Sequence, residues 1–229
     1  MNTTRTALIT GASEGFGRAT ALALADRGWD LILTARRLEP LVRVRDATGA
    51  MAVAGDVADP AHRDSLATVI DTAPRLDLVV NNASALGPSP MPRLADYSAA
   101  ELAAVLATNV VAPLAILRLA LPKLRACAGA AVNISSDAAV NAYEGWGGYG
   151  ASKAALDHLT ATFAAENPDL HVYSFDPGDM RTAMHQAAFP GEDISDRPGP
   201  ETAVPALLHL IDARPPSGRY VASDVLAAQ

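Results

Sequence analysis

The sequence predicts a single α/β domain in which a doubly wound, mostly parallel sheet lies between two layers of helices. Three observations lead to this prediction: the chain has 229 residues, half of them are hydrophobic, and short apolar runs alternate with longer Ala/Leu-rich stretches. A chain of this length and apolarity can bury one large core. Strands separated by helices form βαβ crossovers, which produce a parallel sheet covered on both faces.

Seven short apolar runs are the predicted strands. They are continuous rather than alternating, which is typical of strands that are buried on both faces. In chain order they are residues 7–9, 31–33, 52–54, 78–80, 131–134, 172–175 and 218–221, the last as an edge strand.

No repeat, low-complexity tract or linker divides residues 1–229, so one domain is expected. Residues 189–200 are rich in Pro, Gly and Asp and predict a loop after the sixth strand, with helix resuming beyond it. Loops at the carboxyl ends of parallel strands carry binding and catalytic residues. We therefore expect a substrate loop at about residues 180–200.

The composition excludes several kinds of protein. The formal net charge of -7 repels phosphate backbones and anionic membranes, so neither nucleic acid nor membrane is an expected partner. The lone cysteine excludes an internal disulfide, and the five scattered histidines show no metal-binding spacing, so no metal site is expected. No signal-peptide pattern opens the chain, and no apolar run approaches the roughly 18 residues of a membrane span. A soluble, cytoplasmic protein is expected.

Residues 10–17 read Thr-Gly-Ala-Ser-Glu-Gly-Phe-Gly and lie between the first predicted strand and an Ala/Leu-rich helix. Glycines at such a turn let the chain reverse sharply and present backbone N–H groups to a pyrophosphate at the helix N-terminus. This context favours a dinucleotide site. An ordinary strand–helix turn is the alternative.

Tyr149 and Lys153 stand four residues apart at the start of another Ala/Leu-rich stretch, and residues four apart share one face of a helix. A free tyrosine has a pKa of about 10, and bringing it near neutrality requires about 4 kcal/mol. A neighbouring ammonium favours the phenolate. The pair is thus a candidate proton donor and acceptor; a surface Tyr/Lys pair is the alternative.

Two further polar residues extend this pair. Ser136 ends the fifth strand, so it and Tyr149 can reach one crevice, where a hydroxyl steadies a developing alkoxide. Ser135 is the rival, because side chains alternate along a strand. Asn109 precedes Pro113 by four residues in a helical stretch. Since proline has no N–H for that carbonyl, the Asn109 carbonyl is free to hold a water, with a plain helix kink as the alternative.

Taken in order, these motifs resemble the short-chain dehydrogenase/reductase family, in its shorter, single-domain branch with TGxxxGxG and YxxxK motifs, over nearly the whole chain. The resemblance implies a Rossmann-like fold and a catalytic set of Asn109, Ser136, Tyr149 and Lys153. It also implies cofactor contacts from Gly11, Ser13, Glu14, Gly15, Phe16, Gly17, Arg36, Arg37, Asp56, Val57, Asn82, Ala83, Ser84, Tyr149, Lys153, Pro177, Gly178 and Thr182. Ser84 departs from the family pattern, because it replaces the last glycine of the NNAG segment.

The resemblance further implies a role for each catalytic residue. Tyr149 is the general acid in reduction and the base in oxidation, and Lys153 lowers its pKa and holds the nicotinamide ribose. Ser136 orients the reacting oxygen, and Asn109 anchors a water in a proton relay. Hydride passes directly between nicotinamide and substrate carbon, so the protein contributes positioning and electrostatics.

The end of the second strand indicates which dinucleotide binds. An acidic residue there holds the ribose hydroxyls of NAD, whereas an arginine accommodates a 2′-phosphate. This chain has Arg36 and Arg37 and no acid, which predicts NADP(H) as preferred and NAD(H) as possible. Glu14 stands where NADP-preferring relatives often carry Lys or Arg, and its repulsion would reduce the preference. A solvated helix start is the alternative for the two arginines.

The predicted function is NADP(H)-dependent interconversion of a carbonyl compound and its alcohol. One alternative, a catalytically silent NADP(H)-binding sensor or scaffold, predicts a broken catalytic set. Another, epimerisation or dehydration of nucleotide-linked substrates, predicts a TGxxGxxG loop and a longer chain. Tyr143, Trp146, Met184, His185 and Phe189 indicate either a pocket for an apolar carbonyl compound or packing under the loop. A homodimer or homotetramer is expected.

Overall fold

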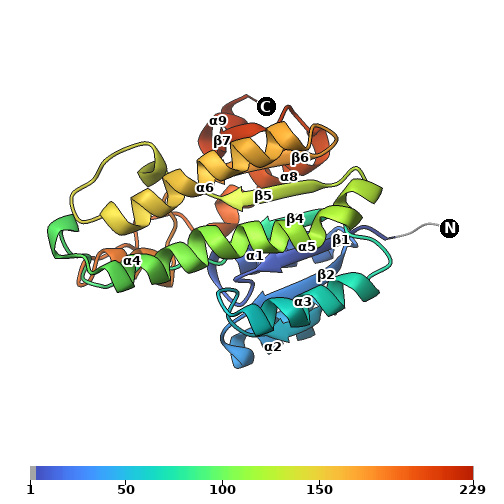
Figure 1. Ribbon diagram of the computed structural model, residues 1–229, viewed down its shortest axis with the longest axis horizontal. Helices are drawn as coiled ribbons and strands as arrows, with labels where there is room; N and C mark the ends of the chain where they lie inside the picture. Colours follow the sequence, from blue (N-terminus) through green and yellow to red (C-terminus); the bar gives the residue numbers. More distant parts are fainter. Residues whose placement is uncertain (1–3, 229) are drawn as a thin grey trace.

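The computed structural model describes residues 4–228. The first three residues, which enter the expectation of no signal peptide, lie outside this range. Figure 1 shows a sheet crossed by long helices. The strands within the described residues are β1 (Thr6–Thr10), β2 (Asp30–Ala35), β3 (Met51–Ala54), β4 (Leu78–Asn81), β5 (Ala130–Ile134), β6 (His171–Asp176) and β7 (Gly218–Val221).

These strands form one sheet in the order β3-β2-β1-β4-β5-β6-β7, and each neighbouring pair is parallel. Every predicted strand lies within an observed one, and β7 is the edge strand that the sequence predicts. The strand order reverses between β1 and β4. In a doubly wound sheet, ligands bind at this point, outside the carboxyl ends of the strands.

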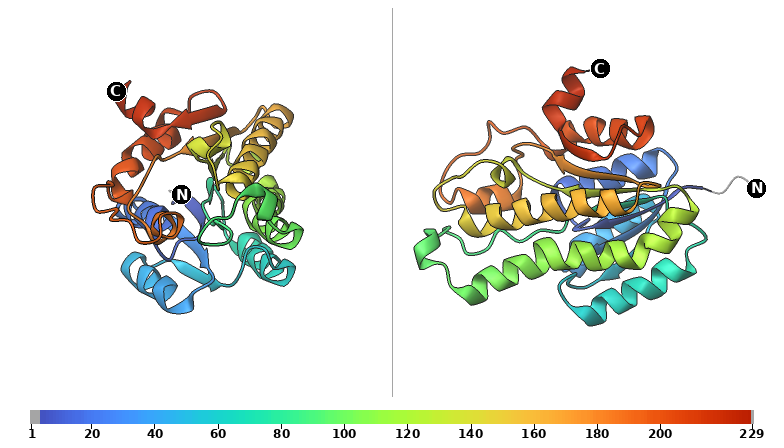
Figure 2. Two further views of the ribbon diagram at one scale, coloured as in Figure 1. Left: turned by 90° about the vertical axis from the view of Figure 1, so that its left-hand side faces the viewer. Right: turned by 45° about the horizontal axis from the view of Figure 1, so that its top comes forward.

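Helices cover both faces of the sheet, so the predicted three-layer architecture is confirmed (Figure 2). The main helices are α1 (Gly15–Asp26), α2 (Leu38–Thr48), α3 (Pro60–Thr72), α4 (Ala99–Leu106), α5 (Ala112–Ala126), α6 (Gly147–Glu166), α7 (Ala183–Ala188), α8 (Val204–Ala213) and α9 (Ala222–Ala227). Four short helical turns are η1 (Leu94–Asp96), η2 (Ala107–Val111, a π-helical turn), η3 (Asp137–Ala139) and η4 (Pro200–Ala203).

The alternation of side chains along each strand divides the core in two. In β1, Ala7 and Ile9 join the cluster formed with α1, α2, α8 and α9. Leu8 points to the other face and joins the cluster formed with α3, α5 and α6. All three are fully buried, which explains why the strands read as continuous apolar runs.

The segment Ala99–Ala126, which joins α4, η2 and α5, corrects one sequence-based expectation. By length and composition it is apolar enough to cross a membrane. Its residues Ile116, Leu117 and Leu124 instead pack against the sheet in the core, and Figures 1 and 2 show α5 running alongside α6. The core helix of a soluble protein can have the same length and apolar composition, so these two properties of the segment are weak evidence for a membrane span.

The loop predicted over residues 189–200 is present between α7 and η4. The sequence analysis missed α7, which occupies the first part of the expected substrate loop. Thr182 caps this helix by accepting a hydrogen bond from the backbone N–H of His185 at 3.2 Å. A serine or threonine that precedes a helical turn is a preferred N-cap, so this signal was available in the sequence.

Candidate active site

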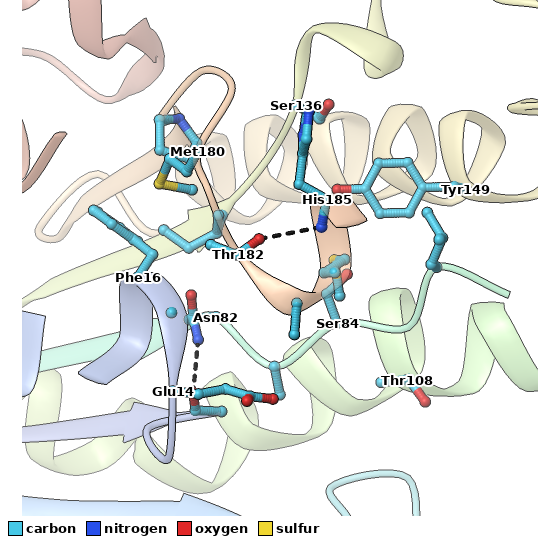
Figure 3. Close-up of a pocket in the computed structure, with 18 of the residues that line it drawn as sticks. Glu14, Phe16, Asn82, Ser84, Thr108, Ser136, Tyr149, Met180, Thr182 and His185 are labelled. Carbon is cyan, nitrogen blue, oxygen red and sulfur yellow. Dashed lines mark hydrogen bonds between the residues drawn. The ribbon is translucent and has the colours of Figure 1, made fainter. Parts of the chain in front are cut away.

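A cavity of about 590 Å³ opens at the carboxyl ends of the strands, at the point where the strand order reverses. It brings together residues from the loops after β1, β2, β3, β4, β5 and β6. All the sequence-predicted site residues line it except two, Gly17 and Asn109. Figure 3 draws 18 of the lining residues around the same opening and labels ten of them, among them Glu14, Tyr149 and His185.

The glycine loop follows β1 and enters α1 with backbone angles that favour glycine. Gly11 and Gly15 have φ angles of 63° and 54°, a region that side chains with a Cβ rarely adopt. Gly17 lies behind the cavity. A Cβ at this position would stand 2.5 Å from the Gly11 carbonyl oxygen and 2.4 Å from Asn82 Nδ2. Gly17 is therefore required for the close packing of α1 against the glycine loop and Asn82.

Asn82 fastens the loop after β4 to the glycine loop. Its Nδ2 donates to the carbonyl oxygens of Thr10 at 2.9 Å and Gly11 at 3.1 Å. The backbone N–H groups of Asn82 and Ala83 both donate to Thr10 Oγ1 at 2.9 Å. Asn82 thus supports the shape of the glycine loop in addition to lining the cavity.

The two arginines after β2 line the cavity, but they differ in their partners. Arg37 forms an ion pair with Glu14, while Arg36 has no ion-pair partner among the residues that the structure describes. The sequence analysis expects Glu14 to repel a phosphate. The structure modifies this expectation, because the Glu14 carboxylate engages one of the two guanidiniums that would hold the phosphate.

Tyr149 and Lys153 lie on the first turns of α6, as the sequence predicts, and both are buried. Lys153 Nζ is 5.5 Å from the centre of the Tyr149 ring and donates to the carbonyl oxygen of Ile134 at 2.7 Å. Figure 3 shows the Tyr149 ring directed into the cavity. The phenol and the ammonium therefore share one buried environment at the end of β5.

Burial changes the protonation of both groups. It raises the pKa of Tyr149 well above its ordinary value; the Ser136 hydroxyl opposes this change and the Asp176 and Asp137 carboxylates add to it. Burial lowers the pKa of Lys153 to about 8, against the effect of Asp157 and Asp176. The sequence analysis expects Lys153 to lower the pKa of Tyr149. The pKa of Tyr149 instead rises, and removal of the phenol from water is the largest cause.

Ser136 and Ser135 both line the cavity, so the argument from alternation alone does not separate them. Ser136 Oγ donates to Asp137 Oδ1 at 3.0 Å and accepts from the Ala138 N–H at 3.2 Å. Its hydroxyl also acts on the pKa of Tyr149. Ser135 Oγ is buried and has no hydrogen-bond partner within residues 4–228. The contact with Tyr149 favours Ser136 as the functional serine.

Asn109 lies in the π-helical turn η2, four residues before Pro113. A π-helical turn is a local departure from the regular helix. The backbone is therefore irregular at Asn109, where the missing N–H of Pro113 predicts an irregularity. The side chain is fully engaged: Nδ2 donates to Ala85 O at 2.8 Å and Ser152 Oγ at 2.9 Å, and Oδ1 accepts from the Ala85 N–H at 2.7 Å. Asn109 anchors the loop behind Ser84 and does not reach the cavity surface.

An apolar wall closes the cavity beside Tyr149. It includes Leu86, Trp146 and Met184, and the Trp146 ring packs edge-on against Tyr149 with ring centres 5.8 Å apart. Phe189 stands outside the lining and packs on Trp146 at 5.8 Å. Tyr143 also stays outside and donates to Asp137 Oδ2 at 2.7 Å. Both alternatives from the sequence therefore apply: Trp146 and Met184 line the pocket, whereas Phe189 and Tyr143 pack outside it.

Sequence reasoning missed a charged group behind the site. Arg219 lies on the edge strand β7, opposite Ser174 of β6. Its Nη2 donates to the Ser136 carbonyl oxygen at 3.0 Å and to Asp176 Oδ2 at 2.8 Å, and its Nε donates to Asp157 Oδ2 at 3.1 Å. No motif marks Arg219, because its position depends on the pairing of β7 with β6.

Among the described residues, no group of three or more His, Cys, Asp or Glu side chains is arranged to hold a metal ion. The cavity instead combines a glycine loop, a helix N-terminus, two arginines and a buried Tyr/Lys/Ser cluster. This arrangement suits a phosphorylated dinucleotide whose reactive end lies near a proton-transferring phenol.

Comparison with known proteins shows the family of the chain. The profile of the family described as short chain dehydrogenase matches residues 5–193. The chain is 37% identical over 188 residues to serine 3-dehydrogenase of Agrobacterium fabrum, covering 77% of this chain and 72% of that protein. It is 33% identical over 199 residues to sepiapterin reductase of Mus musculus, covering 79% and 76%.

Solved structures show the same similarity. A short-chain dehydrogenase of Shigella flexneri complexed with NADP has a TM-score of 0.88 at 30% identity, covering 96% of this chain and 97% of that one. A short-chain dehydrogenase of Escherichia coli complexed with NADPH has a TM-score of 0.87 at 31% identity, covering 95% and 96%.

Fold and site together define an oxidoreductase with a Rossmann-like dinucleotide-binding fold. The chain belongs to the short-chain dehydrogenase/reductase family.

Proposed function

We propose that this protein is an NADP(H)-dependent oxidoreductase that interconverts a carbonyl compound and its alcohol, with Tyr149 as the acid and base. The observation that carries the proposal is the buried cluster of Tyr149, Lys153 and Ser136 in the cavity at the strand ends. A cluster of this kind can donate a proton to an alkoxide as it forms and can steady the charge on that oxygen.

The residues around the cavity fit the dinucleotide. The glycine loop and the N-terminus of α1 would hold the pyrophosphate, Arg36 and Arg37 a 2′-phosphate, and Lys153 the nicotinamide ribose. When bound, the reduced cofactor would supply a hydride, whereas the oxidised cofactor would accept one and would bring a positively charged nicotinamide ring. Asp56, Val57, Pro177, Gly178 and Thr182 line the cavity and would contact the adenine and nicotinamide ends, as the resemblance implies.

Proton transfer depends on the environment of Tyr149. In reduction, the protonated phenol donates to the substrate oxygen, and burial, which raises its pKa, favours this form. In oxidation, the phenolate is needed, so positive charge near the ring must offset the desolvation. Lys153 is the nearest candidate from this chain, at 5.5 Å from the ring centre. Asn109 would support a proton relay by holding the loop of Ser84 and Ala85.

The cofactor preference rests on charge at the end of β2. Two guanidiniums and the absence of an acid after Ala35 favour NADP(H) over NAD(H). The Glu14–Arg37 ion pair opposes this preference in part, because a phosphate competes with the carboxylate for Arg37. We therefore propose a preference for NADP(H) with residual use of NAD(H).

The substrate we propose is an aldehyde or ketone with an apolar or aromatic body. Leu86, Trp146 and Met184 provide an apolar wall next to Tyr149, and such walls bind apolar bodies while a few polar groups fix orientation. A cytoplasmic location, and assembly into a homodimer or homotetramer, complete the proposal.

The test is the loss of NADPH absorbance with a panel of aldehydes and ketones. Tyr149→Phe is expected to lower kcat by several orders of magnitude while NADPH binding, followed by fluorescence, stays near normal. Tyr220→Phe is the matched control, because the Tyr220 hydroxyl donates to Pro216 O away from the cavity. Turnover retained by Tyr149→Phe would refute the proposed chemistry. Binding of NADPH without turnover of any carbonyl by the unmodified protein would favour the sensor.

A further inference from the structure

Behind the proposed catalytic cluster, one guanidinium joins three elements that meet at the strand ends. Arg219 of β7 bonds to the backbone of Ser136 after β5, to Asp176 at the end of β6 and to Asp157 of α6. The Arg219 side chain is 27% exposed, and those of Asp157 and Asp176 are 16% and 5% exposed. These contacts are largely shielded from water, so their electrostatic effect is stronger than that of a surface ion pair.

Both carboxylates also face the ammonium of Lys153. Asp157 lies one helical turn after Lys153 on α6, and Asp176 lines the same cavity. Each acts on the pKa of Lys153, and Asp176 also acts on that of Tyr149. Without a partner, both carboxylates would favour the charged ammonium, and that of Asp176 would also disfavour the phenolate.

From this geometry we infer that Arg219 is a positioning residue for the catalytic cluster: it occupies Asp157 and Asp176 and holds the Ser136 backbone, which leaves Lys153 directed at Ile134 and the cavity. The inference rests on the proposed function of Tyr149 and Lys153. Without Arg219, the Lys153 ammonium has two carboxylates as competing partners, and the charge that opposes the Tyr149 phenolate increases.

The other titratable groups around the cluster remain in place when Arg219 is replaced. Those facing it from the packed elements are Asp137 after β5, which Tyr143 and Ser136 engage, and the pair of Asp179 after β6 and His185 of α7, which lines the cavity. No contact between any of the three and Arg219 is present among the described residues. A change in the pH profile of an Arg219 variant is therefore attributable to Asp157 and Asp176.

The experiment measures kcat/KM for oxidation of an alcohol substrate against pH. In Arg219→Met, the rising limb should move to higher pH by about one unit, which lowers the rate on that limb about tenfold. In the double variant Arg219→Met/Asp176→Asn, removal of the carboxylate that raises the pKa of Tyr149 should return the limb at least halfway. Arg219→Lys keeps the charge but replaces a planar fork, whose Nε and Nη2 reach acceptors on different elements, with a single nitrogen. Its limb should stay near that of the unmodified protein while kcat falls.

Thermal unfolding and fluorescence titration with NADPH establish that each variant is folded and binds cofactor. Arg27→Met, which removes the exposed Arg27–Asp212 pair, is the control for loss of an ion pair elsewhere. If Arg219→Met fails to fold, the Asp176→Asn single variant decides: the limb should move to lower pH, because this carboxylate raises the pKa of Tyr149. An unmoved limb in a folded variant, or a shift that Asp176→Asn does not reverse, would overturn the role of Arg219. That result leaves the Tyr149→Phe outcome untouched, so the two proposals fail separately.

Discussion

The ammonium of Lys153 donates a hydrogen bond to the carbonyl oxygen of Ile134 at 2.7 Å, and both residues are buried. This bond ties α6 to the end of β5, one residue before the Ser135–Ser136 pair. It fixes the position of the Lys153 Nζ relative to the Tyr149 ring, 5.5 Å from the ring centre. The energetic consequence is a lysine held in a position that disfavours its charged form.

The pH dependence of folding should report this buried lysine. Its pKa is about 8 in the folded protein and about 10.4 when solvated. Between these values the native state has released a proton that the unfolded state retains, so stability should rise with pH across this window. The expected gain is on the order of 2–3 kcal/mol.

Urea unfolding at pH 7 and pH 10 checks this gain. Lys153→Met should lose the increment, whereas Lys123→Met, which replaces a lysine bonded to exposed carbonyl oxygens, should keep it. Equal pH dependence in both variants would contradict the buried origin of the effect.

Gly17→Ala should damage the cofactor site through packing. The added Cβ would stand 2.5 Å from the backbone oxygen of Gly11, an atom that cannot move without displacing the glycine loop. We expect a loss of about 1–3 kcal/mol in the free energy of unfolding, together with weaker NADPH binding. Gly218→Ala is the control, since its Cβ would meet Tyr220 at an ordinary 3.8 Å. A stable Gly17→Ala protein with normal NADPH affinity would show that the loop tolerates the displacement.

Arg36→Ala should weaken NADPH binding much more than NADH binding. A charge-assisted bond to phosphate contributes about 1.5–3 kcal/mol, which corresponds to a loss of about 10- to 150-fold in affinity. Fluorescence titration with both cofactors measures the difference. Arg43→Ala, which removes an arginine paired with Glu39 on α2, should change neither. Equal losses of NADPH and NADH affinity would refute the phosphate assignment.

Glu14→Gln should strengthen NADPH binding several-fold and leave NADH binding nearly unchanged. The substitution removes the carboxylate that pairs with Arg37 and frees that guanidinium for the 2′-phosphate. The gain should shrink at high ionic strength, because both side chains are more than half exposed. No gain at low salt would show that Arg37 does not contact the phosphate.

The fold was largely predictable because parallel strands buried on both faces leave a direct trace in the sequence. Residues 131–134, for example, are apolar on both sides of the pleat apart from Asn133, whose side chain is satisfied by bonds to Asn81 and Thr160. Helix α7 was missed because it has only six residues and lies between two segments rich in Pro, Gly and Asp, residues 177–179 and 189–200. The segment Ala99–Ala126 is long and apolar enough to cross a membrane although its side chains enter the core, so composition cannot separate a core helix from a spanning one.

Most of the candidate site was predictable for a different reason. Backbone turns that approach a phosphate require glycine, and residues four apart on a helix share a face. Gly11, Tyr149 and Lys153 can therefore be recognised from the sequence alone. The direction of the Tyr149 pKa change could not be, because burial depends on the whole surrounding structure. The ion pair between Glu14 and Arg37 likewise joins two loops that are adjacent only after β1 and β2 pair.

The sequence by itself determined the strands, their parallel arrangement, the family and a set of site residues of which all but Gly17 and Asn109 line the cavity, since each leaves a local pattern of apolar, glycine or reactive side chains. The tertiary structure alone decided how far the phenol and ammonium are removed from water, and that Arg219 stands behind Ser136. Desolvation and long-range charge pairing are sums over groups brought together by folding, and no short segment of the chain contains them.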